Sequence, residues 1–404
     1  MRILQINTTI NSGSTGRIAE DIGNVLLVTG NESYIAAGNT YRPSISQIIE
    51  IGNDWDQKRH GVKARLFDRH GFGSKNVTLQ FVKEVDQIRP DVIHLHNIHG
   101  YYLHIGELFN YLKQVQLPVV WTFHDCWPFT GHCSFFDRVN CHKWQTGCHH
   151  CPNLKGYPAS FGYDNSLRNY SDKKKIFNGL HNCTITTPSE WLANHVRSSF
   201  LGNYPVHCIH NGVDIKIFSP STKTESILAK YQLKTKPFIL GVASIWDQRK
   251  GLKDFEAISQ RNNGSFDIAL VGLTKKQIVN LPNGIIGIER TESTQELAAL
   301  YAAASAFVNP TYVDNFPTTN IEALACCTPV ITYNTGGSPE AIDKNTGIVV
   351  EKGDINALNE AIKTVLNLGK DFYNPKCRIR AEELFNKENR YNDYLELYNE
   401  IIQR

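Results

Sequence analysis

Two acidic residues, Asp314 and Glu322, flank a segment whose sequence is typical of a helix start. The apolar run Ala306–Asn309 precedes them and predicts a short buried strand. Pro317 suits the first turn of the following helix, because its fixed φ is helical and its missing N–H is not needed there. A helix start binds phosphate oxygens through unpaired N–H groups and a positive dipole end, and a carboxylate about one turn inside can accept two hydrogen bonds from ribose. The segment therefore predicts a nucleotide site, although acids near helix starts also act as simple caps.

Two cations, Arg249 and Lys250, follow another predicted strand at residues 238–243 and precede Gly251 and a helix-like run. Ligands of open parallel sheets collect at the carboxyl edge of the strands, so this pair is placed to bind a diphosphate. Read alone, an Arg-Lys pair is more often a solvated surface feature.

A glycine-containing loop lies between the first predicted strand and the first predicted helix. Gly13, Gly16 and Arg17 form a Gly-x-x-Gly-Arg pattern, and the dinucleotide-binding pattern Gly-x-Gly-x-x-Gly is absent. A glycine loop at a helix start can still hold an anion, so these three residues are candidate donor-binding residues.

Histidines end two predicted strands. His124, followed by Asp125, ends the strand-like run 119–124, and His96 with Asn97 ends the run 92–96. A histidine at a strand end can contact a ligand or can simply cap the sheet by hydrogen bonding. We expect no metal at the alternating histidines of the second run, and His96 and Asn97 are candidate ligand contacts.

Four cysteines lie in an irregular loop rich in Gly, Asn and aromatic residues, at Cys133, Cys141, Cys148 and Cys151. A loop of this length needs something to order it. Four thiolates with a terminal Cys-x2-Cys suit a tetrahedral structural Zn²⁺ ion, and the alternative is a set of buried free thiols. Nearby histidines could replace one ligand; they are His132, His142, His149 and His150.

The segment 58–70 concentrates cations among apolar residues, and Lys58, Arg59 and Arg65 are its candidate ligand-binding cations. As a helix it would present a basic amphipathic surface suited to anionic lipid headgroups or an acceptor diphosphate. A solvated basic helix explains the pattern equally well.

The composition is that of a water-soluble globular protein, with 41% hydrophobic and 20% charged residues among 404. A net charge of +3 is too small to indicate a nucleic-acid partner. No apolar run approaches the ~20 residues that span a bilayer. The first residues form a strand pattern and not a signal peptide, so we expect a cytoplasmic protein with reduced cysteines.

Strand-like and helix-like runs alternate along the chain, which predicts parallel sheets covered by helices on both faces. The strand-like runs are too many for one compact sheet, so we expect two doubly wound α/β domains. The predicted domains are residues 1–210, with a Cys-rich loop at 126–152, and residues 211–385, followed by a helix at 386–404. The polar stretch 211–236 is the predicted linker. The predicted strands are residues 3–7, 92–96, 119–124, 184–188, 206–210, 238–243, 266–271, 306–309 and 330–333. The predicted helices include residues 16–28, 295–305, 355–368 and 388–404.

The acid pair Asp314-x7-Glu322 and the following residues 323–331 closely resemble the signature of retaining glycosyltransferases of family 4. Lys250 with the glycine after it resembles the donor-phosphate element of that family, and residues 335–340 resemble its Gly-Gly-x-Pro-Glu turn. The first residue of this acid pair is usually Glu in the family. Asp314 has a shorter side chain, which can reposition the donor sugar.

The resemblance covers nearly the whole chain and implies the GT-B fold, in which two doubly wound Rossmann-like domains face a central cleft. It implies an acceptor-side N-terminal domain, a nucleotide-sugar-binding C-terminal domain, and a closing helix that crosses back to the first domain.

The resemblance also implies residue roles. Lys250 and Arg249 would neutralise the leaving diphosphate, Arg249 in place of an arginine that many relatives carry earlier in the segment. Glu322 would hold the ribose, and His124 would face the hexose. The implied contacts to the donor sugar and phosphates are Asp314, Phe316, Thr318, Thr319, Gly13, Gly16 and Arg17.

The implied reaction is transfer of a hexosyl group from a UDP- or GDP-hexose to a lipid-linked oligosaccharide in capsule, O-antigen or exopolysaccharide synthesis. The cysteine spacing is also similar to that of colanic-acid-type family 4 transferases. GT-B enzymes need no divalent ion for chemistry, so the expected zinc is structural. We expect a cytoplasmic enzyme that contacts the inner membrane face peripherally. A GT-B epimerase or phosphorylase is the alternative enzyme, and a zinc-bearing nucleic-acid binder is disfavoured by the near-neutral charge.

Overall fold

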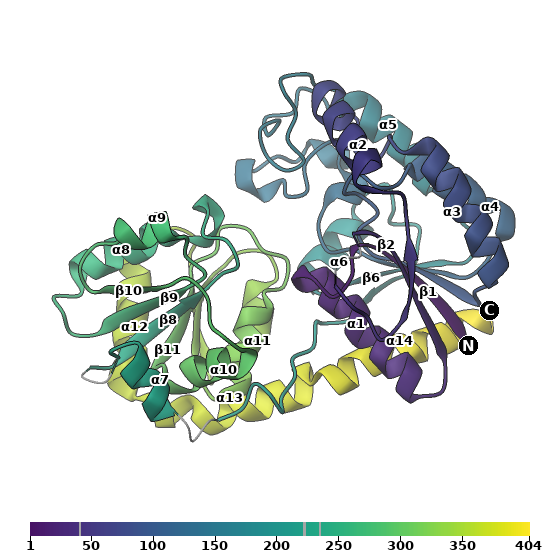
Figure 1. Cartoon of the computed structure of the whole chain (residues 1–404). Helices are drawn as coiled ribbons and strands as arrows, with labels where there is room; N and C mark the ends of the chain where they lie inside the picture. Colours follow the sequence, from purple (N-terminus) through teal and green to yellow (C-terminus); the bar gives the residue numbers. More distant parts are fainter. Residues whose placement is uncertain (40–41, 221–223, 234–235) are drawn as a thin grey trace. The chain divides into compact units, whose positions relative to one another are not determined.

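The computed structural model describes residues 1–39, 42–220, 224–233 and 236–404, and the chain divides into two compact units (Figure 1). The first unit comprises Met1–His210 and Tyr391–Arg404, and the second comprises Asn211–Arg390. Each unit contains one parallel sheet with helices on both faces. The predicted architecture of two doubly wound α/β domains is therefore confirmed. Within the described ranges, no helix is both long and apolar enough to cross a bilayer.

The first unit is built on a seven-stranded parallel sheet of order β3-β2-β1-β4-β5-β6-β7. Its strands are β1 (Arg2–Thr9), β2 (Glu32–Asn39), β3 (Gln47–Glu50), β4 (Val92–Leu95), β5 (Val119–Thr122), β6 (Cys183–Thr187) and β7 (Val206–Cys208). Its helices are α1 (Gly13–Val28), α2 (Asp54–Phe67), α3 (Lys75–Ile88), α4 (Ile105–Val115), α5 (Ser166–Phe177) and α6 (Glu190–Arg197), with 3-10 helices η1 (Trp127–Phe129), η2 (Asp137–Val139) and η3 (Lys143–Gln145). The central strands β4 and β5 are buried along their whole length, as continuous apolar runs in parallel sheets require.

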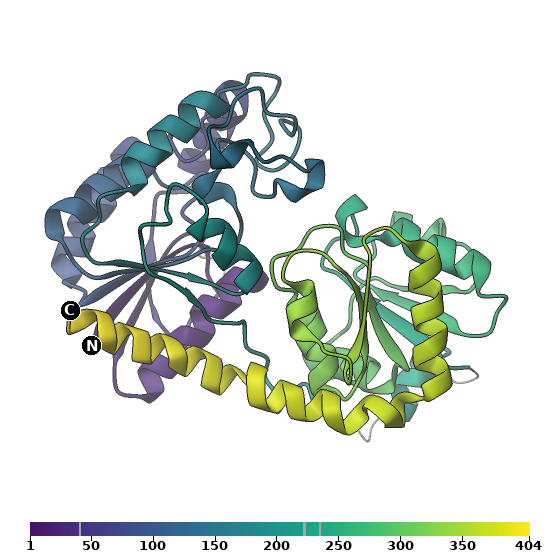
Figure 2. The ribbon, with the colours of Figure 1, turned by 180° about the vertical axis from the view of Figure 1, so that it is seen from behind.

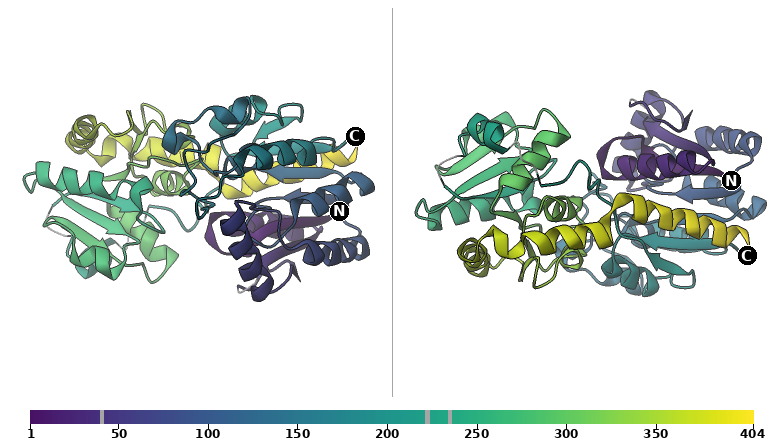
Figure 3. Two further views of the ribbon diagram at one scale, coloured as in Figure 1. Left: turned by 90° about the horizontal axis from the view of Figure 1, so that it is seen from above. Right: turned by 90° about the horizontal axis from the view of Figure 1, so that it is seen from below.

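Successive residues of these strands enter two different cores because side chains alternate between the faces of a sheet. Trp121 packs in the core beneath α3, α4, α5 and α6, whereas its neighbour Val120 packs in the core beneath α1 and α14 (Lys387–Ile402). Tyr394 and Tyr398 of α14 belong to this second core, and Figure 3 shows α14 beside α1. The last fourteen residues, Tyr391–Arg404, therefore complete the first unit, and both chain termini lie on it (Figure 2).

The second unit is built on a six-stranded parallel sheet of order β10-β9-β8-β11-β12-β13 around one hydrophobic core. Its strands are β8 (Phe238–Val242), β9 (Asp267–Val271), β10 (Ile285–Ile288), β11 (Ala306–Asn309), β12 (Val330–Tyr333) and β13 (Gly347–Val350). Its helices are α7 (Thr224–Lys230), α8 (Leu252–Arg261), α9 (Lys275–Val279), α10 (Thr294–Ala303), α11 (Thr318–Ala325), α12 (Ile355–Leu368) and α13 (Lys370–Phe385), with η4 (Gln248–Lys250) and η5 (Ser338–Ala341).

The linker predicted at residues 211–236 is wrong. This stretch belongs to the second unit, where Val213, Phe218 and Leu233 are buried in the core and α7 lies between them. The prediction failed because these buried apolar residues are widely spaced among polar ones. Residues 221–223, which contributed to the prediction, lie outside the described residues.

Candidate functional site

The loop after β8 in the second unit returns to the end of β11. Arg249 and Lys250 lie in η4, and Gly251 follows with φ of 73°. A Cβ atom at Gly251 would lie 2.3 Å from the carbonyl oxygen of Pro310, so the close approach requires glycine. Because β8 and β11 are neighbouring parallel strands, both segments lie at the carboxyl edge of the sheet, where ligands of such sheets bind.

Lys250 and Asp314 are brought together at this edge. Lys250 Nζ lies 2.5 Å from Asp314 Oδ2, and both side chains are partly exposed. The turn at residues 335–340 packs against the backbone of Asp314. A Cβ atom at Gly336 would lie 1.7 Å from the Asp314 carbonyl oxygen, and Gly337 N donates to Asn315 O at 2.8 Å. The turn at residues 335–340 therefore shapes the loop that carries Asp314.

Arg249 is held within its own loop. Its Nε atom lies 2.8 Å from Asp247 Oδ2, its N–H donates to Asp247 Oδ1, and its carbonyl oxygen accepts a hydrogen bond from Tyr312 N at 2.7 Å. The side chain stays partly exposed. A contact between Arg249 and a diphosphate, which stays a prediction, would have to compete with Asp247.

Helix α11 starts at the same sheet edge, with Pro317 at its N-cap position. A buried polar network holds this start. Asn309 Nδ2 at the end of β11 donates to Asn320 Oδ1 at 2.8 Å, and Asn320 Nδ2 donates to Ser338 Oγ at 2.9 Å. Because buried amides need their partners, the network fixes the first turn of α11 relative to β11 and η5.

The three other predicted donor contacts of this segment surround the helix start. Phe316 is buried, with its ring centroid 5.7 Å from that of Phe385, so it can reach a ligand only through its backbone. Thr318 and Thr319 open the first turn of α11 and are partly exposed. The arrangement leaves the anion-binding end of the helix at the sheet edge.

Glu322 lies one turn inside α11, and Tyr301 of α10 donates a hydrogen bond from its hydroxyl to Glu322 Oε2 at 3.0 Å. Tyr301 is fully buried, and burial raises the pKa of its hydroxyl well above the usual value, so the hydroxyl remains a donor. The contact orients the carboxylate that the sequence assigns to ribose. Sequence reasoning missed Tyr301, because nothing in its local pattern distinguishes it from a core residue.

His124 in the first unit belongs to a chain of hydrogen bonds with His96 and Gln5. Gln5 Nε2 donates to Ala19 O at 2.9 Å, so Gln5 Oε1 accepts from His96 Nε2 at 3.0 Å. His96 Nδ1 must then accept the bond from His124 Nε2 at 3.1 Å. Burial lowers the pKa of His96 well below its usual value and that of His124 to about 4, so both rings are neutral near pH 7.

This chain assigns tautomers to the two histidines. With its Nε2 proton directed at His96, the neutral ring of His124 carries its lone pair on Nδ1. Both nitrogens of His96 are engaged inside the protein, so its link to a ligand runs through His124. Sequence reasoning did not identify Gln5, whose position in β1 marks it only as a buried polar residue.

Asp125 and Asn97 have partners of their own. The Asp125 carboxylate lies 3.1 Å from His99 Nε2 and accepts from Trp127 N at 2.9 Å. Burial alone would raise the pKa of Asp125, but these partners bring it below its usual value. The Asn97 carbonyl oxygen accepts from Tyr102 at 2.6 Å. These contacts order the loops that follow β4 and β5.

The glycine loop after β1 is shorter than predicted, because α1 begins at Gly13, three residues earlier than expected. Gly16 therefore lies within the helix, where a Cβ atom would come 2.9 Å from Thr9 Oγ1. Its glycine serves close packing of α1 on the end of β1. Arg17 is exposed in the first turns of α1.

Helix α2 presents the predicted cations outward. Lys58, Arg59 and Arg65 are exposed, and they share the surface with exposed apolar side chains. Trp55 is 74% exposed, with Lys58 Nζ 5.3 Å from its ring centroid. We call this surface the α2 outer face; its residues are Trp55, Lys58, Arg59, Val62, Lys63, Arg65, Leu66 and Phe67.

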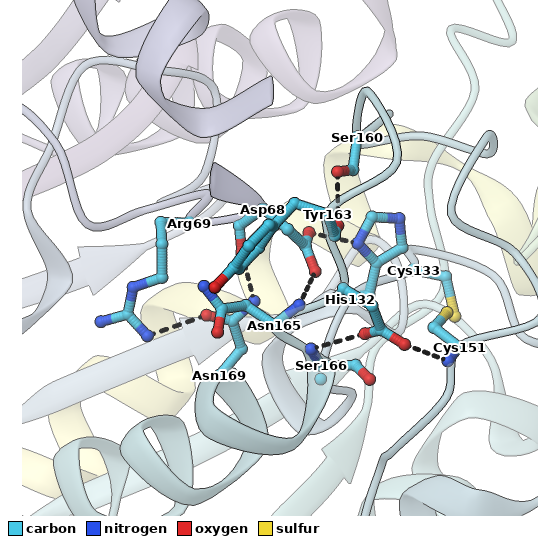
Figure 4. Close-up of polar contacts among 12 residues, drawn as sticks. Asp68, Arg69, His132, Cys133, Cys151, Ser160, Tyr163, Asn165, Ser166 and Asn169 are labelled. Atoms are coloured by element: carbon cyan, nitrogen blue, oxygen red, sulfur yellow. Dashed lines mark hydrogen bonds and ion pairs between the residues drawn. The ribbon is translucent and has the colours of Figure 1, made fainter. Parts of the chain in front are cut away.

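The four predicted metal ligands line one small cavity in the first unit. Cys133 and Cys151 share a thiol hydrogen bond, and Cys141 and Cys148 contribute to the same walls. All four are free thiols. The loop that carries them is drawn in part in Figure 4.

Two family models match the chain. Residues 18–217 match the model described as Glycosyltransferase Family 4, and residues 236–368 match the model described as Glycosyl transferases group 1. Together they cover most of both units.

Known proteins resemble the chain over most of its length. WcaC of Escherichia coli (strain K12), which its name assigns to colanic acid biosynthesis, is 27% identical over 385 residues and covers 90% of each chain. Sucrose-phosphate synthase from Thermosynechococcus elongatus has a TM-score of 0.74 at 19% identity, over 99% of each chain. Anabaena HepE, solved with UDP-glucose, has a TM-score of 0.66 at 13% identity, over 98% of this chain and 99% of its own. The two solved structures share the fold of this chain.

Proposed function

The chain belongs to the family 4 and group 1 glycosyltransferases with the GT-B fold, and from this premise we propose the reaction that it catalyses. The proposed reaction moves a hexosyl group from a UDP- or GDP-hexose to a lipid-linked glycan, with retention of the anomeric configuration. The product would be a repeat of a bacterial surface polysaccharide.

The observation that carries this proposal is the constellation at one sheet edge of the second unit. Lys250 and Asp314 are 2.5 Å apart, the start of α11 lies beside them, and Glu322 follows with its carboxylate oriented by Tyr301. A cation and a helix start suit a diphosphate, and a fixed carboxylate suits a ribose diol. One short region thus offers both halves of nucleotide-diphosphate recognition.

The proposed chemistry is electrostatic. Lys250 would exchange its partner Asp314 for the phosphate oxygens of the donor and would stabilise the charge that develops as the glycosidic bond breaks. Asp314 would then be released to accept hydrogen bonds from the sugar. The departing phosphate would take the proton of the acceptor hydroxyl, and His124 would orient the hexose.

Relatives support the donor and the pathway at a coarser level. HepE was solved in complex with UDP and with UDP-glucose, and the name of WcaC places it in colanic acid biosynthesis. These names favour a nucleotide-sugar donor and a surface polysaccharide product for this chain.

The α2 outer face supports a membrane-bound acceptor. It combines exposed apolar side chains such as Trp55 and Leu66 with cations such as Lys58 and Arg59. Cations attract anionic lipid headgroups, while large apolar side chains insert between them. We propose that this face docks on an anionic membrane surface that holds the lipid-linked acceptor.

The first experiment measures binding and transfer in the full chain. We expect calorimetric titration to show micromolar binding of UDP or GDP, and radiolabel from the matching NDP-hexose to enter a lipid-extractable product. A donor that is consumed without any transfer, and recovered as its epimer, would overturn the transferase assignment.

The second experiment measures sedimentation with vesicles. Binding is expected for vesicles that contain phosphatidylglycerol and not for phosphatidylcholine alone, and Lys58→Glu with Arg59→Glu should abolish it. Lys83→Glu, on the exposed face of α3, is the matched control. Equal binding of both vesicle types, or equal loss in the control, would reject the α2 outer face as the docking surface.

A further inference from the structure

The segment between η1 and α5, residues 130–165, contains only two three-residue 3-10 helices, η2 and η3. It is nevertheless packed: Phe136 and Trp144 are each 1% exposed, and their rings lie 5.0 Å apart. So long an irregular segment needs cross-links to hold one conformation. The sequence places four cysteines in it and no disulfide joins them.

These thiols meet around a cavity of about 20 Å³, which is room for a single ion or water molecule. Its walls include Cys133, Cys141, Cys148 and Cys151. The sulfurs of Cys133 and Cys151 lie together in Figure 4, in hydrogen-bonding contact. Cys148 Sγ accepts a hydrogen bond from Gly131 N at 3.2 Å, a contact that suits a thiolate.

A histidine adds an independent sign of a ligand at this cavity. His132, which is 2% exposed, lines the cavity, and its Nδ1 atom is bonded to the Asp68 carboxylate. Its Nε2 atom is buried and has no hydrogen-bond partner among the residues described. With the proton on Nδ1, Nε2 carries a lone pair, which is the tautomer found in metal-ligating histidines backed by a carboxylate.

We propose that this loop binds one structural Zn²⁺ ion through the thiolates of Cys133, Cys141, Cys148 and Cys151. Four soft sulfur ligands favour tetrahedral Zn²⁺ over hard cations such as Mg²⁺ or Ca²⁺. The terminal Cys148-x2-Cys151 pair matches the spacing of ligands in structural zinc sites. His132 lies next to Cys133 in sequence and is the competing fourth ligand.

The cavity must contract for this ion to bind. Cys133 and Cys151 are in contact, yet no third ligand atom of the loop lies within 4.8 Å of both among the residues described. In tetrahedral coordination all four sulfurs lie about 4 Å apart, given Zn–S bonds of ~2.3 Å. Cys141 and Cys148 therefore move inward on binding, and metal affinity is linked to the order of the loop.

The loop in turn anchors two helices. Asp68, just after α2, receives hydrogen bonds from His132 Nδ1 and from Asn165 N at 2.9 Å, and its carbonyl oxygen accepts from Asn169 Nδ2 at 2.6 Å (Figure 4). Phe161 N donates to the carbonyl oxygen of Arg65 at 2.9 Å. The proposed ion would thus hold the end of α2 and the start of α5 in place.

Metal analysis of the purified full chain tests the proposal. We expect elemental mass spectrometry to find about one zinc per chain. The zinc should be lost in Cys148→Ser and in Cys151→Ser and retained in the control Cys183→Ser, whose cysteine lies in β6. Co²⁺ in place of zinc should give the charge-transfer bands of tetrahedral cobalt–thiolate coordination. Two results would overturn the zinc assignment. One is a chain that contains iron and sulfide in place of zinc. The other is a chain without metal in which four thiols titrate freely or Cys133 and Cys151 form a disulfide.

Two further variants test the ligand set, and one measurement guards against misfolding. Zinc retained in Cys141→Ser but lost in His132→Asn would replace Cys141 by His132 as the fourth ligand and so overturn the set proposed. In the wild-type chain, a chelator should accelerate proteolysis within residues 130–165, and unchanged cleavage would reject a structural role. The chelator should leave the binding of UDP and GDP by the second unit unchanged. Failure of the zinc proposal can therefore be distinguished from failure of the proposed transferase function.

Discussion

The contact between Tyr301 and Glu322 allows a quantitative prediction for nucleotide binding. Glu322 Oε2 accepts the tyrosine hydroxyl at 3.0 Å, and a carboxylate has about four lone-pair sites, so the same group can accept two hydrogen bonds from a ribose diol. A hydrogen bond to a charged group contributes about 1.5–3 kcal/mol. Glu322→Ala removes two such bonds, part of which water replaces, so we expect a loss of about 2–4 kcal/mol, or roughly 30- to 700-fold in Kd.

Tyr301→Phe should have a smaller effect of the same sign. The buried ring keeps its packing and Glu322 keeps its charge, so only the orientation of the carboxylate is lost. We expect a cost of about 1 kcal/mol, or roughly fivefold in Kd. Calorimetric titration with UDP and GDP measures both variants.

Tyr231→Phe is the matched control for this comparison. Its hydroxyl also donates to a glutamate of the second unit, Glu296, at 2.6 Å, but that glutamate is not part of the proposed site. Nucleotide affinity should stay within twofold of wild type in this control. If Glu322→Ala binds as well as wild type, or if Tyr301→Phe behaves like the control, the ribose assignment or the orienting role is wrong.

Three further predictions concern charge, tautomer and pH. Lys250→Ala should weaken UDP or GDP binding about 10- to 100-fold but leave uridine or guanosine binding unchanged in the same titrations, since it removes a charge-assisted phosphate contact. Gln5→Leu should lower kcat about tenfold without changing nucleotide affinity, because the hydrogen bonds that fix the tautomer of His124 are lost. Steady-state kinetics measures this effect, and a change in KM instead of kcat would show that the contact is only structural. Below pH 6.5 the chain should lose stability, since burial lowers the pKa of His60 to about 4 and its Nε2 atom accepts the Gly73 N–H, so the folded form binds fewer protons than the unfolded form. For His60 this linkage amounts to about 3 kcal/mol between pH 6.5 and 4, at ~1.4 kcal/mol per pKa unit, so His60→Gln should reduce the loss seen in urea unfolding by about that amount. The buried His96 and His124 should keep their own share of the slope.

The strands that the sequence predicted and those that it missed differ in their place in the sheets. Central strands such as β4, β5, β11 and β12 are mostly apolar and are buried along their whole length because both of their faces are covered. Edge strands bury less, and their patterns are weak. β3, β10 and β13 lie at sheet edges and were missed, whereas the fourth edge strand, β7, was predicted at residues 206–210. β2, an inner strand, was also missed, and polar residues such as Glu32 and Ser33 interrupt its apolar pattern.

The sequence by itself determined the chemistry that stays local. Asp314 and Glu322 are separated by one helix start, Lys250 follows one strand, and the four cysteines share one loop. Short spacing and residue type were therefore enough to identify the glycosyltransferase family, and the roles of these residues stay predictions.

Only the tertiary structure decided which side chains orient these groups. Lys250 meets Asp314 across 64 residues, Tyr301 meets Glu322 from a different helix, and Gln5 reaches His96 across 91 residues. Each pair is joined by parallel strands and packed helices whose neighbours in space are far apart in the chain. The partner of a polar side chain is therefore set by the order of strands in the sheet, which no local pattern records.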